Sequence, residues 1–301
     1  MSLTELEYVK QQISLGRRLH LHDGVWWKRV APLYHTPAYR FKKIAPGSAR
    51  PAMSKGGLMY SHVVPESTTA NRMLTCYAIT RPWLSQYDVG ILNAKRRNCV
   101  KRGLLRCGIR RLEAEETDRH KEDIREVVIS QAARQQRDGF GTPPSYYATH
   151  FEEWWQAAVR LFTLPGRDLW GAFVAGKLVA YVFIEQVEEV ANFVAVKANS
   201  EYKVSCPVDA LYHTVICALR DDPRCAMIVS GGPSKAGLAT FKEQYQFKLT
   251  EIPIYTRGAG LYGLATRLMG AATAAKQRFA KRRASPEPAE APEPTLPESN
   301  D

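Results

Sequence analysis

The stretch from Cys225 to Tyr255 constrains the fold of this chain more than any other. It opens with a short apolar run, passes through a turn that contains Gly231 and Gly232, and closes with a second strand-like run. Between the two runs lies a segment that includes Phe241 and Lys242. Glycines between periodic segments mark turns. The stretch therefore predicts a strand, a glycine-bearing turn, a short helix and a closing strand.

The residues before this stretch extend the same pattern. A helix is predicted from Pro207 to Arg220, because proline favours the first helical position and Asp209 stands in the first turn. Three strand-like runs precede that helix, and a glycine turn joins the first two into a hairpin. These runs are 169–175, 178–186 and 189–197.

The first half of the chain gives a weaker pattern. One helix is predicted over 83–102, with Gly103 ending it and a strand at 104–112 following. Four irregular strands are predicted before this helix, at 25–34, 39–44, 57–64 and 73–80. Two further helices are predicted after it, at 116–137 and 147–162. The second of these has aromatic residues at helical spacing, which indicate core packing.

The order of elements in 225–255 resembles the end of a GNAT-type acyltransferase domain. More narrowly, the spacing of Phe241, Lys242, Tyr245 and Phe247 resembles the FemAB branch, the bacterial transferases of the peptidoglycan-bridge type. These enzymes acylate amines with aminoacyl or acyl donors. The resemblance implies that the Phe-Lys pair ends a helix beside the acceptor and that the lysine stabilises the developing oxyanion. A solvated lysine beside a core phenylalanine is the alternative.

The run RNCVKRG at 97–103 also resembles the first half of FemAB-like proteins, so the resemblance covers most of residues 20–255. It implies an α/β (α+β) fold with a GNAT-like mixed, largely antiparallel sheet flanked by helices. The predicted segments are an N-terminal extension (1–19), a degenerate N-terminal GNAT-like half (20–115), a connecting helix and loop (116–145), a more complete C-terminal acyltransferase domain (146–258), a basic amphipathic helix (259–283) and a disordered tail (284–301).

Charge is distributed unevenly along the chain. The last 17 residues hold five acids, five prolines and no Lys or Arg, a composition typical of disorder. The remainder carries 42 cations against 25 acids, a net charge of +17. Its densest run, 95–111, has eight cations and no acid, which favours anionic partners such as donor phosphates, a nucleotide- or lipid-linked amine, tRNA or another RNA. A solvated helix face is the alternative. The candidate phosphate-binding residues are Arg96, Arg97, Lys101 and Arg102.

Acylation of an amine requires a base, close positioning of two reactants and stabilisation of the carbonyl oxygen. Besides Lys242, the helix residue Phe241 belongs to the candidate site. Four side chains are candidates for the general base, and the sequence does not distinguish them. They are Glu185, Asp209, Tyr212 and His213.

The donor is expected to be a cosubstrate, with no bound cofactor. The loop 201–210 contains no glycine, so its backbone cannot approach a pyrophosphate as the coenzyme A loop of GNAT enzymes does. Coenzyme A is therefore less favoured as the donor. The resemblance to the FemAB branch implies aminoacyl-tRNA instead, and an acyl-carrier protein stays open. An anion could still bind at the helix start, where Lys203 and Ser205 lie, or at the glycine turn, where Gly231, Gly232 and Lys235 lie. The alternative for the glycine turn is that it only connects a strand to a helix.

Six scattered cysteines include no C-x-x-C pair, so no metal site and no disulfide framework is predicted. No signal peptide and no run of eighteen apolar residues is present, which indicates a cytoplasmic protein. The basic amphipathic stretch 261–283 suggests peripheral contact with an anionic membrane on its inner face, with docking on the protein's own core as the alternative. The oligomeric state stays open.

These observations predict a FemAB-like N-acyltransferase that transfers an acyl or aminoacyl group to an amine. The first alternative is an acetyl-CoA-dependent GNAT acetyltransferase. The second is a non-catalytic RNA-binding module, which the basic run supports and the lack of interleaved aromatics in that run opposes.

Overall fold

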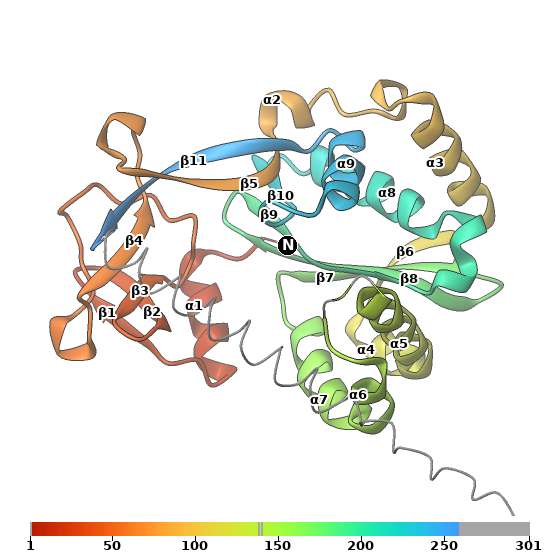
Figure 1. Cartoon of the computed structure of the whole chain (residues 1–301), viewed down its shortest axis with the longest axis horizontal. Coiled ribbons are helices and arrows are strands. Elements are labelled where there is room, and N and C mark those ends of the chain that lie inside the picture. The colour runs from red at the N-terminus through yellow and green to blue at the C-terminus, as the bar shows by residue number, and fades with distance from the viewer. Residues whose placement is uncertain (1, 138, 140, 259–301) are drawn as a thin grey trace, which may run out of the picture. The chain divides into compact units, whose positions relative to one another are not determined.

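The computed structural model describes residues 2–137, 139 and 141–258 (Figure 1). Residues 1–256 form one compact unit, and only 257 and 258 of the second unit, 257–301, are described. The predicted basic helix (259–283) and acidic tail (284–301) lie outside the described residues. Among the described helices, none has the length and apolar character needed to cross a membrane.

Within the described residues, eleven strands form one sheet in the order β1-β2-β3-β4-β11-β5-β10-β9-β8-β7-β6. Strands β6 to β9 pair antiparallel, as do β5 with β10 and β5 with β11. Parallel pairing joins β9 to β10 and β3 to β4. The predicted mixed, largely antiparallel sheet is therefore confirmed. The strands are β1 (Leu19–His22), β2 (Val25–Ala31), β3 (Tyr34–Pro37), β4 (Met59–Val63), β5 (Arg72–Thr80), β6 (Gly108–Leu112), β7 (Arg167–Val174), β8 (Lys177–Val187), β9 (Val190–Ala198), β10 (Met227–Val229) and β11 (Lys248–Arg257).

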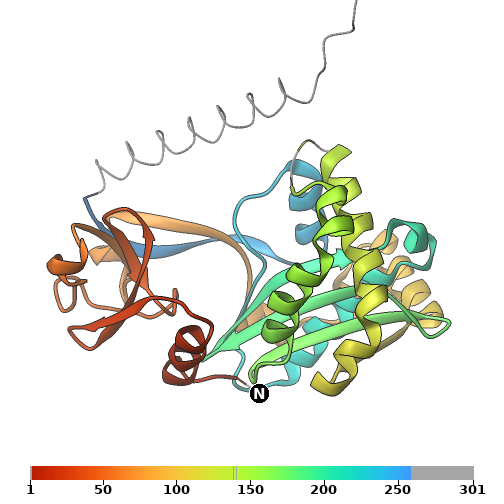
Figure 2. The same cartoon turned by 90° about the horizontal axis from the view of Figure 1, so that it is seen from below.

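Helices cover both faces of strands β6 to β9 (Figures 1 and 2). On one face lie α3 (Ala94–Arg106), α8 (Pro207–Asp221) and α9 (Ala236–Gln244). On the other face lie α4 (Ala114–Thr117), α5 (Lys121–Arg137), α6 (Pro144–Thr149) and α7 (Phe151–Phe162). Each face has its own apolar core, with Val215 and Ile216 of α8 in one and Ile124 and Trp155 in the other. The remaining helices are α1 (Glu5–Ser14) and α2 (Arg81–Leu84), with 3₁₀ turns η1 (Met53–Lys55), η2 (Ser67–Thr69), η3 (Val89–Ile91), η4 (Asp118–His120) and η5 (Ser200–Ser205).

The first half of the chain contributes a strand to the middle of the sheet. Strand β5 lies between β10 and β11, so that Ile79 stands opposite Ile228 and Leu74 opposite Ile252. The amino-terminal residues also join the sheet, because Leu3 forms a bridge with Val187 at the end of β8. The two halves suggested by the sequence therefore share one continuous sheet.

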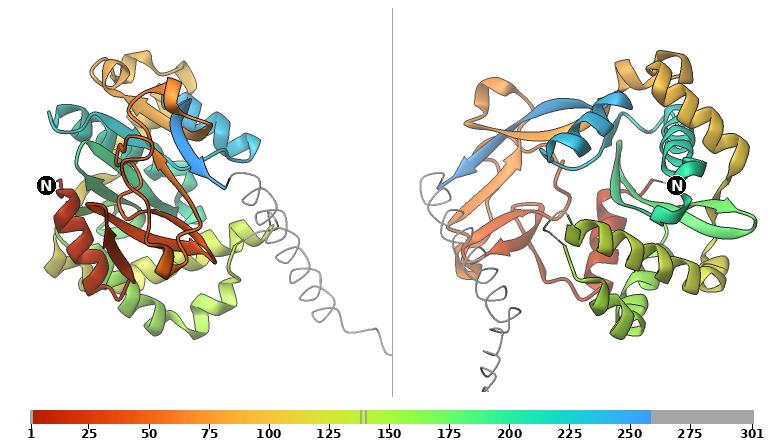
Figure 3. Two further views of the ribbon diagram at one scale, coloured as in Figure 1. Left: turned by 90° about the vertical axis from the view of Figure 1, so that its left-hand side faces the viewer. Right: turned by 45° about the vertical axis from the view of Figure 1, so that its right-hand side comes forward.

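The hairpin of β7 and β8, strand β9, helix α8 and the unit β10-α9-β11 follow the sequence predictions closely. The prediction that Gly103 ends a helix is wrong. Helix α3 continues through Gly103 to Arg106, and a Cβ atom at this position would lie 2.6 Å from the Cys206 carbonyl oxygen and 2.8 Å from Ala210 Cβ. This glycine permits close packing of α3 on α8 (Figure 3, right).

Three other element predictions require correction. The helix predicted over 83–102 is divided because Asn93 caps a new helix, its side chain accepting a hydrogen bond from the Arg96 amide. The helix predicted over 147–162 is interrupted at His150, whose φ and ψ of −117° and 26° are not helical. Residues 39–44, predicted as a strand, form turns and a single bridge instead.

Candidate active site

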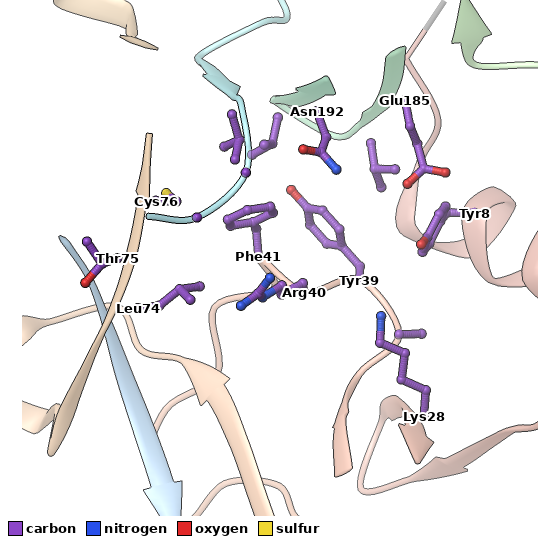
Figure 4. A pocket seen from close by; sticks show the side chains of 16 residues that line it. Tyr8, Lys28, Tyr39, Arg40, Phe41, Leu74, Thr75, Cys76, Glu185 and Asn192 are labelled. Carbon is purple, nitrogen blue, oxygen red and sulfur yellow. The ribbon is translucent and has the colours of Figure 1, made fainter. Parts of the chain in front are cut away.

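A pocket of about 320 Å³ lies between the first-half strands and the face of β8 and β9 (Figure 4). Elements from distant parts of the sequence form its walls, including α1, β2, the segment after β3, β5, β8, β9 and the turn after β10. Three of the predicted site residues line it, namely Glu185, Gly231 and Gly232. The principal polar residues beside them are Tyr8, Lys28, Tyr39, Arg40, Thr75, Cys76 and Asn192.

The hydroxyl group of Tyr39 is a reason to consider this pocket a candidate binding site. Tyr39 is only 8% exposed, and its hydroxyl oxygen is buried without a hydrogen-bond partner. The hydroxyl points into the pocket towards Asn192 (Figure 4). An unpaired buried hydroxyl costs free energy, and a ligand with a polar group at this point would remove the cost.

Glu185 is the acidic residue of the pocket wall. Its carboxylate lies 2.6 Å from the guanidinium of Arg167 and also accepts a hydrogen bond from Tyr8. Burial raises the pKa of Glu185, and the nearby charge of Arg167 opposes that rise. A carboxylate with a raised pKa is a better proton acceptor than one in water, so Glu185 can serve as a general base.

Two cations face the same space. Burial lowers the pKa of Lys28, and the neighbouring charge of Arg40 adds to this effect. Neither cation forms an ion pair with any other residue in the described part of the chain. An acceptor or donor that carries an anionic group would satisfy both.

Lys242 lies directly behind the turn that carries Gly231 and Gly232. It is 5% exposed, and its ammonium donates hydrogen bonds to Ser234 Oγ at 2.8 Å and to the Gly232 carbonyl at 3.5 Å. The ring of Tyr77 lies 4.9 Å from Nζ, and burial lowers the pKa of the ammonium. Lys242 is thus not the solvated lysine of the alternative interpretation. These two bonds use two of the three N–H donors of the ammonium.

Gly231 lies both on the pocket wall and close to Lys242. A Cβ atom on Gly231 would lie 3.8 Å from Lys242 Nζ, and the residue adopts a φ of +70° that favours glycine. Because Gly231 has no side chain, a substrate atom that lies against its main chain would be near the Lys242 ammonium.

The neighbouring Phe241 points away from the pocket. Its ring packs against Tyr212 and Tyr245 with centroids 5.0 and 5.1 Å apart, in the core beneath α8. Burial raises the pKa of Tyr212 to about 12, so its hydroxyl is protonated at neutral pH and does not act as a base. His213 packs against Tyr87 and Cys217, and neither it nor Tyr212 lines the pocket.

Two of the predicted phosphate-binding cations hold the fold together instead. Arg96 donates to the Asp209 carboxylate at 2.7 Å and to Gln244 at 2.6 Å, which ties α3 to α8 and α9. Arg97 donates to the Leu92 carbonyl at 2.6 Å. Asp209 also accepts a hydrogen bond from Tyr245, and unlike Glu185 it does not line the pocket. Lys101 and Arg102 are exposed.

The start of α8, where the sequence suggested an anion site, is covered by α3. Cys206 and Pro207 are buried, and the close approach of Gly103 places α3 against the Cys206 carbonyl. Lys203 is exposed and Ser205 half-buried in the preceding turn η5, and Lys235 is exposed after the glycine turn. These residues do not line the pocket.

The fold brings Cys99, Cys206 and Asp209 within 4.8 Å of one another, a cluster that their spacing in the sequence does not reveal. Burial and the neighbouring Cys99 raise the pKa of Cys206 to about 11, so its thiol is neutral. Because Arg96 already pairs with Asp209, a cation placed here would meet a positive charge and the neutral thiol of Cys206. The chemistry of this donor set fits a packing contact between α3 and α8.

The sequence did not single out Tyr8, Lys28, Tyr39, Arg40 or Asn192. Four of the five come from the weakly patterned first half, and no motif joins them. The one available signal was Asn192, a polar residue within an apolar run on β9. A single polar position in a strand is too common to identify a site.

No protein-family model matches the chain, and no curated protein matches its sequence significantly. Solved structures do match its fold. FemX superposes with a TM-score of 0.56 at 12% identity, over 86% of this chain and 92% of FemX. The chain has the fold of FemX. The resemblance to the FemAB branch is thereby confirmed at the level of the fold.

Two further structures support this assignment of the fold. One is the C-terminal domain (DUF2156) of a protein from Agrobacterium fabrum that is assigned as a lysylphosphatidylglycerol synthetase. Its TM-score is 0.56, at 12% identity over 89% of this chain and 96% of that domain. The other is a conserved protein of unknown function from Bacteroides thetaiotaomicron, with a TM-score of 0.51 and 14% identity over 84% and 90%.

Proposed function

We propose that this chain is an N-acyltransferase that binds an amine in the pocket and acylates it with an acyl or aminoacyl donor. The observation that carries the proposal is the arrangement of Glu185 and the Gly231–Gly232 turn around one pocket, with Lys242 behind the turn. The FemX-like fold supports the same class of reaction.

The proposed reaction uses groups that the pocket already presents. The amine nitrogen attacks the donor carbonyl carbon, a C–N bond forms, and the ester or thioester bond to the leaving group breaks. Glu185 accepts the proton that the amine loses, and the leaving alcohol or thiol takes up a proton. The third N–H of Lys242 stabilises the carbonyl oxygen as it gains negative charge, a contribution of about 3 kcal/mol for one aimed donor.

The acceptor is proposed to carry an anionic group beside its amine. Lys28 and Arg40 supply two positive charges on the pocket wall, whereas Glu185 already pairs with Arg167. Tyr39 lies between the cations and Asn192, and we propose that both supply polar contacts to the acceptor (Figure 4). Nucleotide- and lipid-linked amines both have this chemistry.

The proposed donor is an aminoacyl-tRNA or an acyl-carrier protein in preference to coenzyme A. The start of α8 is covered by α3 and has no glycine loop, so it offers no open set of amides to a pyrophosphate. Coenzyme A should bind no more tightly than roughly 1 mM. Calorimetric titration with coenzyme A measures this directly, and micromolar binding would restore the acetyltransferase alternative.

The test of the proposal is a transfer assay with each donor class. Charged tRNA, acyl-carrier protein and acyl-CoA are offered in turn with a panel of amines, with and without phosphate groups, and products are detected by mass spectrometry. We expect transfer to an anionic amine, and a fall of ten- to a thousandfold in turnover for Lys242→Met. Ser234→Ala is the matched control, because it removes a partner of the ammonium and leaves the charge. Full activity of Lys242→Met would contradict the proposed role of this lysine.

A further inference from the structure

The exposed end of helix α3 carries an apolar and cationic patch that the transferase reaction does not use. Leu105 is 86% exposed and Leu104 47%, in the last turn of the helix. Val204 of η5 is 68% exposed, and its carbonyl accepts a hydrogen bond from Arg106, the residue after Leu105. Three aliphatic side chains thus stand in water at one corner of the described structure.

Cations surround these aliphatic side chains. Lys101, Arg102 and Arg106 are all exposed on the same end of α3, and none forms an ion pair with a described residue. Arg102 and Arg106 are four residues apart, so two like charges neighbour each other on the helix surface, an arrangement that destabilises a helix. By contrast, Arg96 and Arg97 of the same run are bonded within the fold, and Arg110 and Arg111 pair with Glu116 and Asp168.

The end of α3 is packed and hydrogen-bonded on the side opposite to its exposed leucines. Gly103 packs against the main chain at Cys206, and Arg96 ties the first turn of the helix to Asp209. Cys107, directly after the helix, is buried and donates to the Ser205 carbonyl.

We propose that Leu104, Leu105, Val204, Lys101, Arg102 and Arg106 form a docking surface for an anionic lipid bilayer. Aliphatic side chains that protrude from a surface enter the boundary between headgroups and acyl chains, and flanking cations attract anionic headgroups. RNA fits the patch less well, because RNA-binding surfaces add aromatic rings on which bases stack and this patch has none. The inference is independent of the proposed transferase activity.

The test measures binding of the full chain to vesicles by co-sedimentation. The vesicles are phosphatidylcholine alone, or two parts phosphatidylcholine with one part phosphatidylglycerol. We expect the parent to bind only the anionic vesicles, and the variant Leu105→Ser with Val204→Ser to bind them at least about tenfold more weakly. Lys101→Gln with Arg102→Gln should weaken binding and make the remaining binding less sensitive to salt concentration.

A matched control comes from exposed aliphatic residues elsewhere. Leu33 and Met53 are 46% and 56% exposed, and Leu33→Ser with Met53→Ser should bind vesicles as the parent does. Thermal unfolding of each variant shows that all are folded. Unchanged binding by the Leu105 and Val204 variant, an equal loss in the control, or no vesicle binding by the parent would each overturn the proposal. Binding to a single-stranded RNA that falls with the two aliphatic substitutions would also count against it.

Discussion

Arg167 and Glu185 stand directly opposite each other on β7 and β8, and their side chains form an ion pair of 2.6 Å at the wall of the pocket. The side chain of Arg167 is only 2% exposed and that of Glu185 18%, so the pair is largely shielded from water. The arginine fixes the carboxylate in place. Burial nevertheless raises the pKa of Glu185, so this carboxyl group holds its proton to a higher pH than an ordinary carboxyl group does.

The first prediction concerns the pH dependence of the transfer reaction. The base must be deprotonated, so turnover of the parent should rise with pH through the raised pKa of Glu185 and then level off. The rise should occur above pH 4.5, the usual value for this group. A pH–rate profile at saturating substrate measures it. A profile that is flat across the acid range would exclude Glu185 as the base.

The second prediction concerns Gly231, the glycine beside Lys242. Gly231→Ala places a methyl group beside the ammonium and should lower turnover by about tenfold or more, since positioning at the reacting centre is sensitive to small displacements. Gly176→Ala is the matched control, because Gly176 has a φ of +81° but no atom near its missing Cβ. Both substitutions should cost about 1 kcal/mol of stability from backbone strain. Equal activity of the two variants would contradict this role of Gly231.

The third prediction concerns the packing of α3 on α8. In an exposed helix, Gly→Ala stabilises by roughly 1 kcal/mol. At Gly103 the added methyl group would overlap the Cys206 carbonyl and Ala210, so Gly103→Ala should instead destabilise the protein by about 1–3 kcal/mol. Urea unfolding followed by circular dichroism gives the free energy of unfolding. An increase in stability would show that the two helices separate without cost.

The fourth prediction concerns stability in mild acid. Burial lowers the pKa of His20, His35 and His62 below the ordinary value of about 6.5. The unfolded chain then takes up protons that the folded chain does not, so the stability from these residues is complete above pH 6.5 and is lost as the pH falls through their lowered values.

Urea unfolding midpoints at pH 7.5 and pH 5.5 provide the measurement for these histidines. The midpoint should fall at the lower pH, and it should fall less in His35→Gln, which removes the most deeply buried of the three. An identical fall in the variant would show that other groups cause the loss.

The sequence predicted the second half of the fold well because its elements are consecutive. The hairpin around Gly176, the start of α8 at Pro207 and the unit that contains Phe241 and Lys242 each depend on residues that are near in the sequence. In the first half, the strands predicted at 25–34, 57–64 and 73–80 correspond to β2, β4 and β5. Their partners could not be predicted, because β5 pairs with β10 and β11, more than 140 residues away, and no local signal specifies such partners.

The same distinction applies to the site. Glu185, Gly231 and Gly232 stand out locally as an acid in an apolar strand and a glycine turn, and the fold brings them to one pocket. Arg96 stood out as part of a basic run, yet its role depends on Asp209 across a helix interface that the sequence does not show. Tyr39 carries no local signal, because only the fold buries its hydroxyl without a partner.

The most direct measurement of the central claim compares turnover of the acylation reaction in two variants. Glu185→Gln alters the pocket wall, whereas His213→Asn alters a predicted base that the fold places away from the pocket. Both are assayed with the same donor and amine after thermal unfolding has confirmed that each is folded. Turnover should fall by about a hundredfold or more in Glu185→Gln and stay within about twofold of the parent in His213→Asn. Loss of activity in His213→Asn with full activity in Glu185→Gln would contradict the account.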